Sequence, residues 1–159
     1  MVSGAMLTPA TDAHFAWMLG EGPPPDRLSL PPGGVDAAWV LRWLRRNLAR
    51  FGQPGNWLIV ADGEVVGLCS HKTAPSADGA VEIGYAVAAE RRRRGHATRA
   101  IALLILAARR DPRIRRLVAE TAVGNLPSQR VLEANGFAKT GTSVDADEGE
   151  VIVWTLEIA

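Results

Sequence analysis

The sequence predicts a mixed α/β fold: a mostly antiparallel central sheet with one parallel strand-helix-strand crossover, flanked by about four helices. Apolar residues alternate with small or polar ones over Val81–Val87, which is typical of a strand with one buried face. From Ala97 to Arg110 the apolar residues fall at helical spacing instead. A further buried strand is expected over Arg113–Thr121. Because a helix crosses over between the two strands, they are predicted to be parallel.

Helix-capping residues, glycines and prolines predict where the elements before the central strand begin and end. A short strand is expected over Ala5–Thr8, and Thr11 then caps a first helix that Gly20 ends. The five prolines between Glu21 and Gly34 predict a loop. A second helix is expected over Val35–Phe51.

Two tryptophans, Trp39 and Trp43, lie four residues apart on that second helix and therefore share one side of it. The sequence favours the interpretation that both anchor the helix in the core. The alternative is that their rings wall an acceptor pocket together with the proline-rich loop. Leu41 belongs to the expected inner face, and Arg45 is expected to face water.

Two hairpins and a short helix complete the expected elements. Asp62-Gly63 is a strong signal for a two-residue hairpin turn, and the acidic segment Asp145–Gly149 is expected to be the turn of a closing hairpin. Gly136 is expected to end the helix. The ranges are Trp57–Ala61 and Glu64–Ser70 for the first hairpin, Asn125–Asn135 for the helix, and Phe137–Val144 and Glu150–Ile158 for the closing hairpin.

Composition and charge narrow the function classes. With 159 residues, 47% of them hydrophobic, the chain is expected to form one domain over residues 1–159. A net charge of +1 predicts no general attraction to nucleic acid or to an anionic membrane. No apolar run reaches membrane-spanning length, so a cytoplasmic protein is expected. Cys69 is expected to pack in the core, and His14, His71 and His96 fit no metal or triad arrangement.

The turn between the central strand and the long helix is a candidate phosphate site. The first backbone N–H groups of a helix have no partner within it, and they carry the positive end of its dipole. A Gly-containing turn aims them at one point, and neighbouring guanidinium groups add charge-assisted hydrogen bonds to phosphate. The alternative is an ordinary solvated arginine surface. The residues concerned are Arg92, Arg93, Arg94, Gly95, His96, Ala97 and Thr98.

Two segments resemble the signature motifs of the GNAT superfamily, the acyl-CoA-dependent N-acyltransferases. Arg92-Arg93-Arg94-Gly95-His96-Ala97 is similar to that family's Arg/Gln-x-x-Gly-x-Gly/Ala motif. The second segment is Asn125-Leu126-Pro127-Ser128, followed by Val131-Leu132 and Gly136-Phe137. Two motifs in this order, with a strand, a helix and a strand in their expected places, are far more specific than either alone. With Glu82 in Glu-Ile-Gly-Tyr, the chain most resembles the branch that acetylates protein N-termini and ribosomal proteins.

The resemblance implies acetyl-CoA as co-substrate, no metal, and a primary amine as acceptor, on a small molecule or at a protein N-terminus. It implies that the pyrophosphate lies on the arginine turn and that Asn125 and Ser128 approach the pantetheine arm. It also implies that the central strand splays from its parallel neighbour. The backbone N–H of Val87, with Tyr85 nearby, would then polarise the thioester carbonyl. Members of the family often form dimers, so a homodimer is left open.

Two carboxylates are candidates for the base that deprotonates the amine. Glu120 lies five residues before Asn125, where several members of the family place a catalytic glutamate, and Glu82 lies on the central strand. Either could take the proton directly or through a water. Each could instead be a surface carboxylate that pairs with an arginine.

The chain departs from the family pattern at two positions. Leu132 stands where many members carry a tyrosine that protonates the leaving thiolate, and Ala89 replaces a proline often found after the central strand. Tyr85 is the candidate substitute; alternatively the thiolate leaves unaided, because a thiol pKa of about 8.5 makes it a tolerable leaving group. An acyl-CoA-binding protein with little turnover is therefore the alternative function. A nucleic-acid module built on Arg91–Arg94 is disfavoured by the low net charge.

Overall fold

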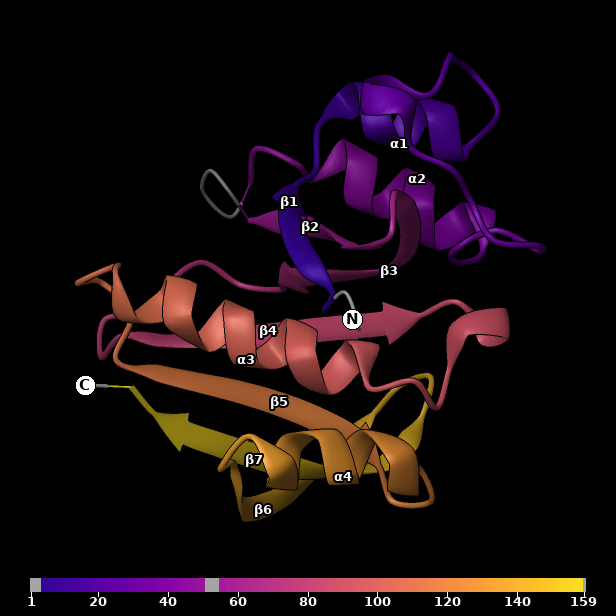
Figure 1. Cartoon of the computed structure of the whole chain (residues 1–159). Helices are drawn as coiled ribbons and strands as arrows, with labels where there is room; N and C mark the ends of the chain where they lie inside the picture. Colours follow the sequence, from indigo (N-terminus) through magenta and orange to yellow (C-terminus); the bar gives the residue numbers. More distant parts are fainter. Residues whose placement is uncertain (1–3, 51–54, 159) are drawn as a thin grey trace.

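The fold is built on a seven-stranded sheet in the order β1-β2-β3-β4-β5-β7-β6 (Figure 1). The computed structural model describes residues 4–50 and 55–158. Neighbouring strands run antiparallel except β4 and β5, which are parallel because a helix crosses over between them. The strands are β1 (Met6–Pro9), β2 (Asn56–Ala61), β3 (Glu64–His71), β4 (Ala80–Val87), β5 (Arg116–Ala122), β6 (Ala138–Asp145) and β7 (Gly149–Glu157).

Four α-helices and two short 3-10 segments lie within the described ranges. They are α1 (Asp12–Met18), α2 (Ala38–Arg46), α3 (His96–Arg109), α4 (Leu126–Ala134), η1 (Pro25–Arg27) and η2 (Ala89–Arg91). As predicted, Thr11 caps α1. The mostly antiparallel sheet, the single parallel pair and the helices confirm the predicted fold class.

The helices lie on both faces of the sheet. On one face α1 and α2 pack over β2 and β3, where Phe15, Leu41 and Leu58 belong to one buried cluster. On the other face α3 packs over β1, β2, β3 and β4, and α4 lies beside α3 (Figure 1). Because strand residues alternate between faces, Ile59 enters this second cluster although its neighbour Leu58 enters the first. The second cluster includes Val81, Ile101, Leu104, Leu117, Leu132 and Trp154, each at most 1% exposed.

On one face of the C-terminal half of the sheet, neither α1 nor α2 covers the strands. Among the described residues, the cluster under α1 and α2 contains none from β4, β5 or β7. The register sets Glu82 beside Val118 and Glu120 beside Val153. Alternation then brings these four side chains to one surface, opposite the face that α3 covers. We call this surface, defined by Glu82, Val118, Glu120 and Val153, the open face.

Helix α2 is shorter than the sequence predicts, and its tryptophans face outward. It covers Ala38–Arg46, and Phe51, where the prediction ended, lies outside the described residues. Trp39 and Trp43 are 71% and 40% exposed, so the interpretation that they anchor the core is wrong. Leu41 lies on the buried side, and a helix turns about 100° per residue, which carries positions 39 and 43 to its far side. Their role as walls of an acceptor pocket stays a prediction.

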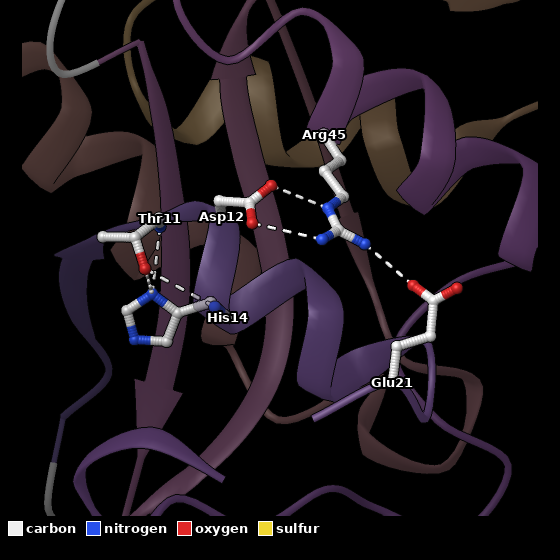
Figure 2. Close-up of polar contacts among 5 residues, drawn as sticks. All are labelled: Thr11, Asp12, His14, Glu21 and Arg45. Carbon is white, nitrogen blue, oxygen red and sulfur yellow. Dashed lines mark hydrogen bonds and ion pairs between the residues drawn. The ribbon is translucent and has the colours of Figure 1, made fainter. Parts of the chain in front are cut away.

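The side chain of Arg45 links α1 to α2 rather than simply facing water (Figure 2). Its Nε and Nη2 donate to the Asp12 carboxylate at 2.7 and 3.1 Å, and its Nη1 donates to Glu21 at 2.8 Å. The hydrogen bond from Arg45 lowers the pKa of Asp12. Beside this contact, His14 Nδ1 accepts a hydrogen bond from the Thr11 N–H at 3.0 Å. The start of α1 is therefore held both by a capping box and by an ion pair to α2.

Both predicted hairpin turns are present. Asp62 and Gly63 have φ angles of 51° and 76°, the left-handed values that a type I′ turn requires at both central positions. In the closing hairpin, Asp145 Oδ1 accepts hydrogen bonds from the N–H groups of Asp147 and Glu148 at 2.8 and 3.0 Å. This turn joins β6, the edge strand, to β7.

Candidate active site

Strands β4 and β5 part halfway along their length. Their parallel register covers Ala80–Arg116, Val81–Leu117 and Glu82–Val118, and it stops there although both strands continue. The segments that no longer pair with each other are Ile83–Val87 on β4 and Ala119–Ala122 on β5. We call the opening between these two segments the splay. It is the feature that the family resemblance implied for the central strand.

The peptide groups of Tyr85 and Val87 face the splay. On its other edge β4 pairs with β3 from Ile83 to Val87, and the hydrogen bonds that flank this ladder involve the even-numbered residues Glu82 and Ala88. The N–H of Lys72 donates to the Glu82 carbonyl at 2.7 Å, and the N–H of Ala88 donates to Val66 at 2.8 Å. In an antiparallel ladder alternate residues point their peptide groups to opposite sides. The groups of Tyr85 and Val87 therefore point away from β3.

The turn after β4 ends at a helix start that no side chain caps. Arg93 and Gly95 have left-handed φ angles of 63° and 80°, and α3 begins at His96, one residue earlier than predicted. The first helical hydrogen bond of α3 runs from the N–H of Arg99 to the carbonyl of Gly95, at 3.0 Å. Within the described chain, the N–H groups of residues 96–98 have no side-chain cap. A Cβ at Gly95 would meet nothing within 4 Å, so the space beside this residue is open.

The four arginines of this turn do different things. Arg91 forms a bidentate ion pair with Glu64, with Nε and Nη2 at 2.6 and 3.1 Å from its two oxygens. Arg92 Nε donates to the Val87 carbonyl at 3.1 Å, at the edge of the splay. Arg93 and Arg94 are exposed, and neither forms an ion pair with a described residue. Arg91 is therefore engaged in an ion pair within the fold, whereas the guanidinium groups of Arg92, Arg93 and Arg94 form no ion pair with a described residue.

Tyr85 joins β4 to the second motif segment across the fold. Its hydroxyl lies 2.6 Å from Ser128 Oγ and donates to the Ser128 carbonyl at 3.1 Å, although the two residues are 43 positions apart. Asn125 Oδ1 accepts the Ser128 N–H at 3.3 Å and so caps α4, as the sequence predicts. Burial raises the pKa of Tyr85 more than the contact with Ser128 lowers it. The phenol is therefore protonated at neutral pH.

Leu132 takes no part in the site. It is 0% exposed and packs in the cluster under α3 and α4, at the position where a tyrosine would have been expected. At His96, burial first, and then Arg94, lower the pKa, which keeps the imidazole neutral at neutral pH.

Glu82 and Glu120 flank the point where the splay begins. Lys72 Nζ lies 3.3 Å from Glu82 Oε1. The Glu120 carboxylate forms no hydrogen bond or ion pair with any described residue. The pKa of Glu120 is raised, first by burial and next by the charge of Glu82; Lys72 opposes this shift, and Asp145 and Glu148 add to it. The two predicted base candidates are thus brought together, and only one of them carries a partner.

Three contacts that fix this site are absent from the sequence motifs. Gln129 is buried and donates to the carbonyls of Ala122 and Val123 at 3.3 and 2.9 Å, which fixes the path from β5 into α4. Asn135 donates to the Thr98 carbonyl at 3.2 Å and ties the end of α4 to the first turn of α3. The Arg91–Glu64 pair is the third. The Asn135 and Arg91 contacts join residues 37 and 27 positions apart, and no local pattern reports such contacts.

Other candidate features lie away from the splay. Two surface depressions of about 840 and 590 Å³ lie at the opposite end of the sheet, and both are lined by Pro112 and Arg115.

Cys69 is buried as predicted, and burial raises its pKa to about 12. The described residues contain no group of three His, Cys, Asp or Glu side chains that could hold a metal ion. No described helix is long and apolar enough to cross a membrane.

A family model described as an acetyltransferase (GNAT) domain matches residues 6–138. The chain belongs to the GNAT acetyltransferase family. This confirms the predicted family and, with it, the predicted activity class, acetyl-CoA-dependent N-acetyl transfer. No curated protein sequence matches the chain significantly.

Several solved structures share the fold at low sequence identity. An acetyltransferase from Salmonella typhimurium that modifies the N-terminal serine of ribosomal protein L7/L12 superposes with a TM-score of 0.73 at 19% identity, covering 98% of this chain and 96% of its own. The aminoglycoside acetyltransferase AAC(6')-Ib, solved with coenzyme A, gives 0.69 at 18% identity and covers 97% and 95%. The microcin C7 self-immunity acetyltransferase MccE, solved with acetyl-CoA and AMP, gives 0.71 at 16% and covers 98% and 93%.

Proposed function

We propose that this chain transfers the acetyl group of acetyl-CoA to a primary amine, which attacks the thioester directly from the open face. One observation carries the proposal: a run of backbone donors follows one edge of β4. The peptide groups of Tyr85 and Val87 turn into the splay, and the uncapped N–H groups of α3 follow after the arginine turn. An extended arm that ends in a pyrophosphate matches this run, because its amides pair with strand backbone and its phosphates with a helix start.

The chain's own residues hold the co-substrate at three places. The N–H groups of residues 96–98 and the guanidinium groups of residues 92–94 bind the pyrophosphate. Asn125 and Ser128, at the start of α4, approach the pantetheine arm. The N–H groups of Val87 and Tyr85 donate to the arm and to the thioester carbonyl. A preorganised donor to such a carbonyl contributes on the order of 3 kcal/mol to the transition state.

Glu120 is the base in this proposal. An amine must lose its proton to attack, and Glu120 has an unpartnered carboxylate among the described residues with a pKa above its ordinary value. A base works best when its pKa approaches the working pH. Glu82 carries an ion pair to Lys72 and is therefore the less available carboxylate. The Tyr85 hydroxyl, protonated at neutral pH, is the donor to the leaving thiolate.

Two acceptor classes enter the test, protein N-termini and small-molecule amines. The similar structures include one enzyme that modifies an N-terminal serine and one named for aminoglycosides, so the fold accommodates both. An α-amino group has a pKa near 8 and a lysine-like amine has a pKa near 10.4. A weaker base can therefore deprotonate the α-amino group. We further propose that residues 1–159 act as one cytoplasmic domain, with homodimer formation open to measurement by light scattering.

Calorimetric titration with acetyl-CoA tests the cofactor, with adenosine 3′,5′-bisphosphate as the control for the nucleotide end. Micromolar binding at one site per chain is expected, and no binding at millimolar acetyl-CoA would refute the proposal. Release of free thiol is then followed with a panel of serine-starting peptides and aminoglycosides. The pH dependence of that release reports the base.

One observation favours the alternative function, an acyl-CoA-binding protein with little turnover. The position of the expected tyrosine is held by Leu132, which is fully buried and has no proton to give. Acetyl-CoA binding without thiol release on any amine of the panel would establish this alternative. Thiol release that depends on Tyr85 would exclude it.

A further inference from the structure

The side chain of Lys72 lies against the site from the end of β3. A Cβ added at Gly84 would come within 3.0 Å of Lys72 Cδ and 3.4 Å of its Cγ. The lysine stem therefore crosses β4 where a glycine leaves room for it. The backbone N–H of Lys72 also donates to the Glu82 carbonyl at 2.7 Å, and Thr73 Oγ1 accepts the Glu82 N–H at 3.0 Å. This segment is thus fastened to β4 beside the start of the splay.

The ammonium group of Lys72 is the cation that faces a group of carboxylates. Its Nζ lies 3.3 Å from Glu82 Oε1, and the two side chains are 47% and 27% exposed. Besides Lys72, three carboxylates from two other parts of the fold act on Glu120 of β5: Glu82 on β4, and Asp145 and Glu148 at the β6–β7 turn. The Lys72 charge acts on Glu120 and on Asp145, and in both cases it favours the ionised carboxylate.

We propose that Lys72 is a positioning residue of the acetyl transfer, whose ammonium group holds Glu82 in an ion pair and so keeps Glu120 free and ionised to accept the proton of the acceptor amine. The inference rests on the proposed function. Lys72 itself touches neither the amine nor the thioester in this scheme. It acts through the two carboxylates.

The physical reason is the behaviour of like charges. Two carboxylates at one site resist being ionised together, and one of them retains its proton to higher pH. A cation paired with one carboxylate offsets that repulsion and lets the other ionise. Without Lys72, the negative charge of Glu82 would act on Glu120 unopposed, and the pKa of Glu120 would rise further.

Three variants test this: Lys72→Met, Lys72→Arg and Lys139→Met. Lys139 is the other lysine of the chain, and its Nζ lies 5.4 Å from the Trp154 ring, away from Glu82, which makes it the matched control. For Lys72→Met the acid limb of kcat/KM against pH should move to higher pH by about one unit, a loss of about tenfold on that limb that recovers at alkaline pH. Lys72→Arg should restore the limb, and Lys139→Met should leave it unchanged.

A uniform loss at every pH for Lys72→Met, or a profile that superposes on the wild type, would overturn the inference. Acetyl-CoA affinity measured by calorimetry should stay the same in all three variants.

A second measurement separates this inference from the proposed function. The side-chain carboxyl carbon of Glu120 can be titrated by NMR in the wild type and in Lys72→Met, with no turnover needed. An upward shift of the Glu120 titration in the variant supports the inference even where no acceptor amine has been found. An unchanged titration refutes it even in an active enzyme.

Discussion

The two edges of strand β4 differ in what they contribute. Along β3 the strand is paired from Ile83 to Val87, whereas along β5 the pairing ends at Glu82. The first edge is closed so tightly that no side chain fits at Gly67 of β3, where a Cβ would clash with the backbone oxygen of Ala86. The second edge leaves peptide groups turned into the splay. One strand therefore provides stability on one side and a binding surface on the other.

The largest expected effect comes from obstructing the open edge where the splay meets α3. Gly95→Glu should weaken acetyl-CoA binding more than about 1000-fold, because it brings a negative charge to the point where a phosphate meets the helix start. The left-handed φ of 80° adds strain for any side chain. Calorimetry measures the affinity.

The matched control is Gly33→Glu, because Gly33 has a φ of 82° and a Cβ added there would also meet nothing within 4 Å. It lies in the proline-rich loop, so the acetyl-CoA affinity of this variant should match the wild type. Equal binding by both variants would contradict the assignment of the phosphate site.

The next effect concerns the chemistry beside the open edge. Glu120→Gln should lower turnover by about 100-fold or more with little change in acetyl-CoA affinity, because the amide cannot take a proton. In the wild type, kcat/KM should rise with pH through the pKa of Glu120, which lies above its ordinary value because of burial and Glu82. The glutamine variant should lose that limb. A larger loss in Glu82→Gln than in Glu120→Gln would exchange their roles.

A smaller effect is expected from breaking the closed edge. Gly67→Ala should lower the free energy of unfolding by about 3 kcal/mol, because the β4 backbone at Ala86 and Val87 and the side chain of Ile59 must shift to admit a methyl group. Urea unfolding measures this change. The control is Gly141→Ala on edge strand β6, where a Cβ would meet nothing within 4 Å. Equal stability of the two variants would show that the closed edge yields more easily than its geometry indicates.

The smallest effect concerns the contact between β4 and α4. Tyr85→Phe removes the hydrogen bonds to Ser128 and should cost about 1 kcal/mol of unfolding free energy. Ser128→Ala removes the same side-chain partner, so the double variant should lose less than the sum of the two. Additive losses would mean that the contact contributes nothing. A fall in turnover for Tyr85→Phe beyond its loss of stability would support the proton-donor role.

Features that depend on local sequence were predictable. Thr11 caps a helix because its side chain reaches a nearby N–H, and Asp62-Gly63 makes a turn because both positions need left-handed backbone. The phosphate turn belongs to the same class, since Gly95 and the helix start are neighbours in the chain. The resemblance to a known family supplied what these local patterns lack, namely the splay and the second motif.

Features that depend on distant contacts were not predictable. Tyr85 meets Ser128 across 43 positions, and no periodicity reports such a pair. Trp39 and Trp43 were assigned to the core from their size and spacing, yet the side of α2 that faces the sheet is set by Leu41 and the cluster beneath it. Which of Glu82 and Glu120 is partnered depends on Lys72, whose stem crosses Gly84 on another strand.

The short ladder between β4 and β5 has a consequence for the end of the catalytic cycle. In the proposed function the arm that would fill the splay is the same in acetyl-CoA and in coenzyme A, so contacts made there would favour binding of the product coenzyme A as much as binding of acetyl-CoA. Such uniform binding tightens the complex without lowering the barrier to the chemical step. Free coenzyme A should therefore compete with acetyl-CoA at similar concentrations, and its departure becomes a step that can limit the turnover rate.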